Sequence, residues 1–556
     1  MSGMRMTRRT LLGTAFLGAL AAVPLLQACG GPAPAPTAAP AAKPTEAPKP
    51  AAQPTTAPAA AATAAPAAAP TAAPKPQAQP TPAAAAASRN YKGKELRYAG
   101  LGSMGEAVEK MGGPWMAERG VKMNRGAFGQ QELEEKILQA MATNSYFVDL
   151  VQFNSNSSGD VMGGGWLLEV PKEIKSLVDM EDVFPLYRDR LLSWQGKQYA
   201  LPYDGDKHMH VFRGDLFADA DNQAKFKAKY GYEMDPKLGP KTWQERRQYA
   251  EFFSGWDWNK SGKNDEAGFA DMTARKDTLW WGFMSRASSY VKHPDDPAVH
   301  FDLDTFEPRI NNPAFVRAVT EWKEELEKFS LPGGTNLKWG ESGPAYRGSL
   351  TTMSIGWWGV AEGDPASSKP EVIKGSRYSI LPGSKEVYNA KAKKWDTIDK
   401  INYAPFIAFG GWVLAVPKNS KEPDLAFEFG SYIAGREKSL EMVTNPTGCQ
   451  PFRYSHLANI ADWTERNAKL DKGMAESYLA AEKATIEHPN VMLDLRIPGF
   501  TQYRDAAELS IAQALSGEKA PQAAMDACAQ VWKEITNRVG GAGKQKELYA
   551  AAMSPK

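Results

Sequence analysis

The 556-residue chain has only three cysteines, Cys29, Cys449 and Cys528, which are too few for a disulfide framework. It also has almost no net charge, because 66 basic residues against 64 acidic ones leave +2. Without a basic surplus, the composition indicates no nucleic-acid partner. After residue 90 no uncharged apolar run is long enough to span a bilayer, so we expect no transmembrane helix in that part.

Several motifs of enzyme active sites are missing as well. The chain has no Gly-Lys-Ser/Thr phosphate loop, no Gly-x-Ser-x-Gly nucleophile elbow and no His-Glu-x-x-His zinc motif. These absences favour a protein that binds its partner over the common hydrolases and nucleotide-dependent enzymes. They leave open an enzyme that works with carboxylates alone.

The first 29 residues have the pattern of an export signal. Three arginines before residue 10 precede an uncharged apolar run at 11–26, which is short for a membrane span. Residues 7–12, TRRTLL, resemble the twin-arginine export motif. Residues 26–29, LQAC, resemble a lipobox, in which the cysteine carries the lipid. We predict a signal peptide over 1–29 with lipidation at Cys29; a plain secretory signal is the alternative.

Residues 30–89 consist mainly of alanine, proline and threonine. Up to residue 88 the segment has no valine, isoleucine, leucine or aromatic residue, so it cannot bury enough apolar surface to offset the cost of ordering. Frequent proline favours extended chain. We predict a disordered tether between the anchor and a folded body at 90–556; a glycosylated threonine-rich stalk is the alternative.

Helical and strand patterns alternate along the body. Apolar residues spaced by three and four predict a helix up to Phe329, with Asn312 as its cap and Pro313 in its first turn. The same spacing predicts helices around 133–141 and 425–433, and short apolar runs predict strands at 147–151, 353–355 and 413–416. This alternation predicts α/β layers with largely parallel sheets, in which ligands bind beyond the carboxyl ends of strands.

Five segments of the body carry a more specific likeness. In chain order they are VDLVQFN at 148–154, WLLE at 166–169, YALPYDGD at 199–206, GGW with VPKNS between 410 and 420, and the set Gly448, Pro451, Arg453 and Ser455. Together they resemble the family 1 extracellular solute-binding proteins of ATP-driven importers, which include maltose- and oligosaccharide-binding proteins. The likeness extends over most of residues 95–540.

The resemblance implies an α/β fold with two lobes, the type II-like periplasmic-binding-protein arrangement, with a hinge between discontinuous lobes and the ligand in the cleft. We place lobe 1 at about 90–204 plus 400–445 and lobe 2 at about 205–399 plus 446–556. The implied function is a monomeric, lipid-anchored binding protein on the outer face of the cytoplasmic membrane. It would capture a sugar or oligosaccharide and deliver it to the permease of an ABC importer, with no catalysis and no required cofactor.

Sugar recognition needs flat apolar faces for the pyranose ring and planar polar groups for its hydroxyls. Trp357 and Trp358 follow a short strand between glycines, and alternation predicts that one is buried and the other faces the cleft. The full set that we expect at the ligand, partly from the resemblance, is Phe153, Asn154, Tyr203, Asp204, Asp206, Trp357, Trp358, Trp412 and Arg453.

Several of these residues have alternative roles. The tryptophans could fill the core, Asp204 could cap a turn, and Arg453 could join the lobes. Asp204 and Asp206 could also be a catalytic carboxylate pair, which would make the protein an exported carbohydrate-active enzyme. A surface adhesin is the third interpretation, and it predicts no small ligand. Cys449 and Cys528 allow one disulfide, which the sequence alone does not settle.

One loop has part of the pattern of a calcium site. Its oxygen donors fall in the register of an EF-hand loop, with Gly262 at the sixth position, but Gly268 stands where the bidentate glutamate belongs. The candidate ligands are Asp257, Asn259, Ser261, Lys263 and Asp265. A polar turn without metal is the alternative.

Overall fold

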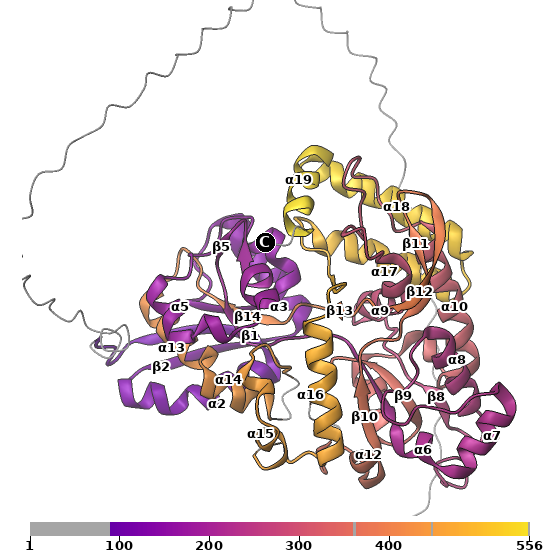
Figure 1. Ribbon diagram of the computed structural model, residues 1–556. Helices are drawn as coiled ribbons and strands as arrows, with labels where there is room; N and C mark the ends of the chain where they lie inside the picture. Colours follow the sequence, from indigo (N-terminus) through magenta and orange to yellow (C-terminus); the bar gives the residue numbers. More distant parts are fainter. Residues whose placement is uncertain (1–88, 360–362, 446–448, 467, 554–556) are drawn as a thin grey trace, which may run out of the picture. The chain divides into compact units, whose positions relative to one another are not determined.

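The computed structural model describes residues 89–359, 363–445, 449–466 and 468–553 (Figure 1). The chain divides into two units, Met1–Gln77 and Ala78–Lys556, and the second contains all of the described residues. The predicted signal peptide, Cys29 and most of the predicted tether lie outside the described residues. No helix in the described part is long and apolar enough to cross a membrane.

A five-stranded sheet forms the centre of the first lobe (Figure 1). Its order is β2-β1-β3-β14-β6, with β1 parallel to β2 and β3, and β14 antiparallel to β3 and β6. The strands are β1 (Glu95–Leu101), β2 (Lys122–Phe128), β3 (Leu150–Asn154), β14 (Trp412–Ala415) and β6 (Leu201–Pro202). The helices that pack around it are α2 (Gly102–Arg119), α3 (Gln130–Thr143), α5 (Lys172–Val178) and α13 (Pro423–Ala434).

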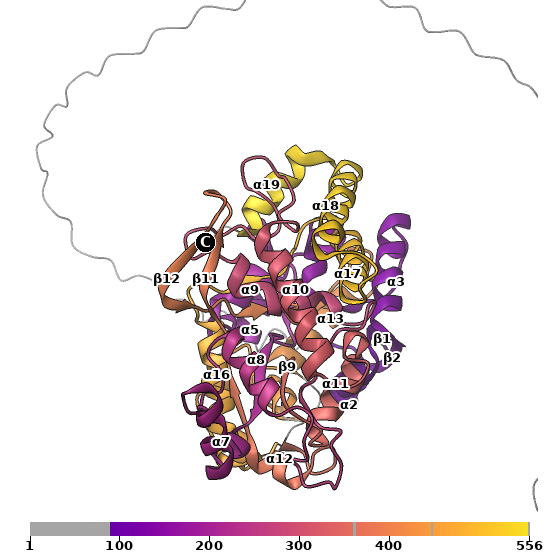
Figure 2. The ribbon, with the colours of Figure 1, turned by 90° about the vertical axis from the view of Figure 1, so that its right-hand side faces the viewer.

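A four-stranded sheet, of order β10-β7-β9-β8, forms the centre of the second lobe. Its strands are β10 (Ser376–Ser379), β7 (Met209–Arg213), β9 (Thr351–Gly356) and β8 (Ala267–Phe269). Helices pack against it and against one another in several layers (Figure 2). The larger ones are α8 (Trp243–Phe252), α9 (Leu279–Val291), α10 (Pro313–Phe329), α16 (Lys472–Ile486), α17 (Phe500–Leu515), α18 (Pro521–Arg538) and α19 (Gly541–Met553).

The remaining elements are short. The helices are α4 (Ser158–Val161), α6 (Gly214–Ala218), α7 (Ala220–Tyr230), α11 (Trp339–Arg347), α12 (Pro370–Gly375), α14 (Arg436–Val443), α15 (Ala461–Thr464) and a π-helix, η3 (Leu186–Leu191). The strand pairs are β4 (Ser193–Trp194) with β5 (Lys197–Gln198), β11 (Ser384–Asn389) with β12 (Lys394–Asn402), and β13 (Phe406–Ile407) with β15 (Met492–Leu493).

The prediction of largely parallel sheets is wrong. Parallel pairing is confined to β1 with its two neighbours, β8 with β9, and β13 with β15 among the named strands of the described residues. A parallel partner needs a crossover connection within its own lobe. β14 instead enters its sheet directly after the chain crosses from the other lobe, and it pairs antiparallel with β3 and β6. The two-lobed α/β architecture itself is as predicted; the predicted lobe boundaries stay a prediction.

The helix signals in the sequence are confirmed more closely than the strand starts. The side chain of Asn312 accepts hydrogen bonds from the first amides of α10, as an N-cap does. β3 begins at Leu150 rather than at residue 147. The carboxylate of Asp149, just before the strand, accepts hydrogen bonds from the amides of Lys421 and Glu422 and so holds the turn that precedes α13. Cys449 and Cys528 are both buried thiols that no disulfide joins.

Candidate functional site

A cavity of about 670 Å³ lies between the two lobes. The first lobe lines it with the end of β1, the start of α2 and the first turns of α3. The second lobe lines it with Trp339, Trp357, the residues before α9 and one face of α17. Its size is within the range of small-molecule sites.

The cavity lies at the edge of the first sheet where the topology leads one to expect a ligand. β1 and β2 are parallel and end at Leu101 and Phe128, and the chain continues from there into the helices that border the cavity. β14 is antiparallel to β3, so its first residue, Trp412, reaches the same edge and lines the cavity. The predicted location beyond the carboxyl ends of strands therefore matches the cavity.

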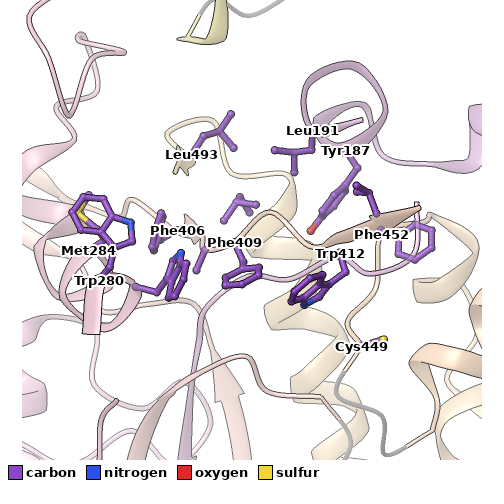
Figure 3. Close-up of a cluster of buried hydrophobic side chains, with 14 of the residues drawn as sticks. Tyr187, Leu191, Trp280, Met284, Phe406, Phe409, Trp412, Cys449, Phe452 and Leu493 are labelled. Carbon is purple, nitrogen blue, oxygen red and sulfur yellow. The ribbon is translucent and has the colours of Figure 1, made fainter. Parts of the chain in front are cut away.

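Aromatic side chains form one wall of the cavity. The ring of Trp357 lies 6.0 Å from that of Trp339 and 5.5 Å from that of Phe409, between ring centroids. Phe409 in turn lies 5.4 Å from Trp412. Figure 3 shows Phe406, Phe409 and Trp412 following one another along the segment that joins the lobes. These edge-to-face and tilted pairs fix the rings without closing the cavity.

Each of these rings is held by its own part of the chain. Trp357 donates its indole N–H to the carbonyl of Ala408, 3.2 Å away, which ties the second-lobe tryptophan to the crossing segment. Two glycines precede Trp412, and Gly411 has φ +86°. A side chain there would overlap the carbonyl oxygen of Asp204, so the close approach of these two segments requires glycine.

The polar part of the lining is strongly acidic. Two cations, Lys276 and Arg504, face the cavity. Seven carboxyl groups share it with them: Glu132, Glu134, Glu135, Asp206, Asp277, Asp505 and Glu508. Even with some of these groups paired, the surplus of carboxylates makes the cavity unfavourable for an anionic ligand.

One ion pair crosses the cavity. Nη2 of Arg504 on α17 lies 3.5 Å from Oε2 of Glu134 on α3, and both side chains are about one-tenth exposed. The two helices face each other in Figure 2. The other oxygen of Glu134 accepts a 2.9 Å hydrogen bond from Asn154 at the end of β3. Asn154 does not line the cavity itself; its amide orients a carboxylate that does, and its role as a ligand contact stays a prediction.

Two further predicted residues support the lining from behind. Tyr203 is buried and donates its hydroxyl to the carbonyl of Met104, a cavity residue, over 3.0 Å. Phe153 is buried in β3 beside Val413 of β14. Within the described residues, neither side chain lines the cavity.

Trp357 and Trp358 point in different directions, as strand alternation predicts. Trp357 is partly exposed and lines the cavity, whereas Trp358 is fully buried against Trp339 and Tyr346. Arg453 lies away from the cavity: its guanidinium donates to the carbonyls of Val178 and Asp179, at 2.8 and 3.0 Å. Its contacts join segments of the first lobe, which leaves its predicted ligand role without support from the structure.

Asp204 and Asp206 lie where the chain first crosses between the lobes. Asp206 reaches the cavity, while Asp204 is enclosed and accepts a 2.8 Å hydrogen bond from the amide of Gln450. Burial raises the pKa of Asp204 to about 6. Burial and the neighbouring Asp204 carboxyl raise the pKa of Asp206 well above its usual value. Asp206 therefore holds its proton to a higher pH than an ordinary carboxyl does.

Replacing Asp206 with asparagine is expected to stabilise the protein at pH 8 and to change little at pH 4. Because folding raises the pKa of Asp206, its stabilising contribution is complete below the unfolded pKa and is lost as pH rises through the folded pKa. Because asparagine does not ionise, the variant avoids that loss, and its free energy of unfolding at pH 8 should be about 1–3 kcal/mol higher than that of the wild type. Urea unfolding at both pH values measures it, with the exposed Asp399→Asn as control. Equal responses of the two variants would contradict the prediction.

Two of the predicted calcium ligands form hydrogen bonds to backbone amides of their own loop. The carboxylate of Asp257 accepts the amides of Ser261 and Gly262, and the side chain of Asn259 also accepts the amide of Ser261. In the described part of the chain, no group of three or more His, Cys, Asp or Glu side chains could hold a metal ion. The hydrogen bonding fits the polar-turn alternative, and calcium at Asp257, Asn259, Ser261, Lys263 and Asp265 stays a prediction.

Several cavity residues carry no signal that a sequence pattern could reveal. Trp339 begins a helix whose sequence carries no cleft motif, and Glu134 and Arg504 lie on ordinary amphipathic helices. Arg504 is 370 residues from its partner in sequence, so no local pattern could pair them.

Two α/β lobes, joined by several crossings and enclosing a cavity lined by aromatic and polar side chains, are the architecture of two-lobed solute-binding proteins. The family described as bacterial extracellular solute-binding protein matches residues 106–471. The chain belongs to this family. No curated protein matches the chain significantly in sequence.

Solved structures share the fold at low sequence identity. An ABC transporter solute-binding protein from Agrobacterium radiobacter K84, in complex with ribitol, has a TM-score of 0.62 and 17% identity, over 83% of this chain and all of that one. A counterpart from Agrobacterium vitis S4 with bound D-mannitol has a TM-score of 0.58 and 18% identity, over 80% of this chain and 99% of that one. Maltose-bound MalE3 of T. maritima has a TM-score of 0.59 and 16% identity, over 80% of this chain and all of that one.

Proposed function

We propose that this protein captures a neutral sugar, oligosaccharide or polyol between its lobes and delivers it to the permease of an ABC importer. The observation that carries the proposal is the interlobe cavity, which Trp339, Trp357 and Trp412 line together with carboxyl groups. Apolar ring faces suit the C–H side of a sugar, and carboxyl groups accept hydrogen bonds from its hydroxyls. Asp206 is the predicted polar contact that reaches this cavity, with Trp357 and Trp412.

The ligands of the structural relatives support this class of solute. The three proteins described above hold ribitol, D-mannitol and maltose, all of them neutral and rich in hydroxyls. The surplus of carboxylates in the cavity of this chain points the same way, since it opposes sugar phosphates and sugar acids.

The geometry favours binding over hydrolysis. A glycosidase needs two carboxyl groups facing one substrate from either side of the bond that breaks. Of the predicted pair, Asp206 alone lines the cavity, while Asp204 is buried with one oxygen bonded to the amide of Gln450. The enzyme alternative would therefore need a different pair from the one that the sequence suggested.

Membrane attachment is a further part of the proposal and rests on the sequence. A lipid on Cys29 and the segment 30–89 would keep the binding body near the outer face of the cytoplasmic membrane, with the body free to reach the permease. Fractionation of cells that express Cys29→Ala tests it, because loss of the anchor moves the protein from the membrane to the soluble exported fraction.

Thermal unfolding with a panel of solutes tests the binding function. We expect a rise in Tm with one class among ribitol, D-mannitol, maltose and longer maltosaccharides, because a ligand at a hundred times its Kd adds about 2.7 kcal/mol to the stability. The phosphorylated counterparts should give at least a tenfold weaker response. Preference for the phosphorylated forms would contradict the neutral class, and release of product sugars would contradict the binding function.

A further inference from the structure

A second cavity, of about 350 Å³, lies away from the interlobe cleft. Strand β4 and the turn that follows it, at 193–196, form one side, and the last turns of α19, with Leu548 and Ala551, form another. Asp189 and two arginines, Arg190 and Arg496, also line it, and the two arginines come from chain segments about 300 residues apart. None of these residues borders the interlobe cavity, so the two cavities are separate.

Arg496 is a buried cation with neutral partners. It is 3% exposed, and its guanidinium donates to the carbonyls of Ser155, Leu191 and Ser193, at 3.2–3.5 Å, and to the hydroxyl of Ser158. Its Nη1 donates to no atom among the described residues. A buried guanidinium usually finds a carboxylate, because carbonyl dipoles compensate a full charge only in part.

Arg190, which is partly exposed, also donates to neutral partners. Its Nη2 donates to the carbonyls of Ala552 and Met553 at the end of α19, at 2.9 and 3.4 Å. The partial negative charge of a helix C-terminus favours this contact but supplies only about half an elementary charge. Over the described residues, neither arginine has a carboxylate within ion-pair distance. Burial lowers the pKa of both, and the charge of Arg190 lowers that of Arg496 further.

The carboxylates nearest to this cavity are engaged elsewhere. Asp189 lines it, but both of its oxygens accept from the guanidinium of Arg188, at 2.8 and 3.2 Å. Asp494, two residues before Arg496, accepts from the indole N–H groups of Trp280 and Trp281. Burial lowers the pKa of a third cation, Lys292, while Asp296 raises it and Arg190 lowers it further; its amine donates to the carbonyl oxygens of His293 and Asp296. Asp494 and Asp296 thus lie near these cations, but among the described residues neither forms an ion pair with Arg190 or Arg496.

We propose that this second cavity is a binding site for a small oxyanion of the phosphate or sulfate class, held by Arg190 and Arg496. A tetrahedral oxyanion supplies the acceptor oxygens that two guanidinium groups require, and arginine is the residue best suited to bind it through paired N–H groups. The volume accommodates the free anion or a small monoester. The site is independent of the solute in the cleft.

Titration of the full chain with inorganic phosphate and sulfate, against chloride at constant ionic strength, tests the proposal. We expect a Tm rise that saturates at low millimolar anion, unlike the unsaturating effect of excluded salts. Arg190→Gln should weaken phosphate binding at least tenfold, the loss expected for one charge-assisted contact. Arg97→Gln, an exposed arginine on β1, should bind phosphate as the wild type does.

A second variant keeps both arginines. Ala551 lines the cavity from an exposed position on α19, so Ala551→Asp places a carboxylate before the arginine pair without removing any buried contact. It should raise the Tm in chloride and abolish the phosphate response, while the response to the sugar or polyol stays unchanged. A phosphate response that does not saturate, or that persists equally in Arg190→Gln and Ala551→Asp, would overturn the proposal.

Discussion

Replacing Trp357 with alanine is expected to weaken binding of the sugar or polyol by roughly 30-fold or more, the loss of an aromatic hot spot of at least 2 kcal/mol. Trp357 is a partly exposed ring of the aromatic wall, held by Phe409, Trp339 and the carbonyl of Ala408. Its loss removes a flat face from the middle of the wall. Calorimetric titration with whichever solute of the panel raises the Tm measures the change.

Two variants separate a lost contact from a damaged fold. Trp357→Phe keeps a smaller flat face and should lose only part of the affinity. Trp256→Ala removes an indole of similar burial that lies outside the cavity, with its N–H on the carbonyl of Phe252. It should leave the affinity unchanged. A Trp256→Ala protein that binds as weakly as Trp357→Ala would show that the loss is structural.

Local signals in the sequence predicted the local parts of the fold. Asn312-Pro313 marks the start of α10 because capping and a fixed proline φ act within one turn. Trp357-Trp358 divides between cavity and core, as alternation of adjacent side chains predicts, although both residues lie just beyond the end of β9. The direction of β14 could not be predicted, since it depends on where the chain crosses between lobes, which no short window records.

The residues of the candidate site also divide into those that local sequence signals predicted and those that depend on packing between the lobes. Asp206, Trp357 and Trp412 were predicted because each follows a motif of glycine, proline or strand that places it at a crossing or a sheet edge. Asn154 and Tyr203 carry the same kind of motif, yet they fold one layer behind the cavity wall. Whether a side chain lies in the wall or behind it is decided by packing across the lobes. That is also why the acid-rich face of α3 and its partner Arg504 became visible only in the structure.

Replacing Lys207 with methionine is expected to destabilise the protein by about 3–5 kcal/mol at pH 8, because it leaves a buried carboxylate without its counter-charge. Nζ of Lys207 lies 2.5 Å from Oε2 of Glu482 on α16, and both side chains are fully buried. The same amine donates to the carbonyls of Gly205 and Pro451, at 2.7 and 3.2 Å. The lysine thus joins two crossing segments to a helix of the second lobe.

The loss should be smaller at pH 5. Burial raises the pKa of Glu482 to about 7 even beside the lysine, so without the lysine the carboxyl binds a proton readily in acid and no longer needs a counter-charge. Urea unfolding at pH 5 and pH 8 measures both values. Lys227→Met, which removes an exposed pair with Glu233, is the matched control and should cost at most about 1 kcal/mol.

A double variant shows where the cost arises. If the penalty of Lys207→Met is the uncompensated charge of Glu482, then Lys207→Met with Glu482→Leu should recover much of the stability, since apolar replacement of a buried ion pair is often neutral. It should also lose the difference between pH 5 and pH 8. If the double variant is instead less stable than Lys207→Met, the hydrogen bonds of Lys207 to Gly205 and Pro451, and of Glu482 to Gln450, hold the crossing together more than the charge pair does.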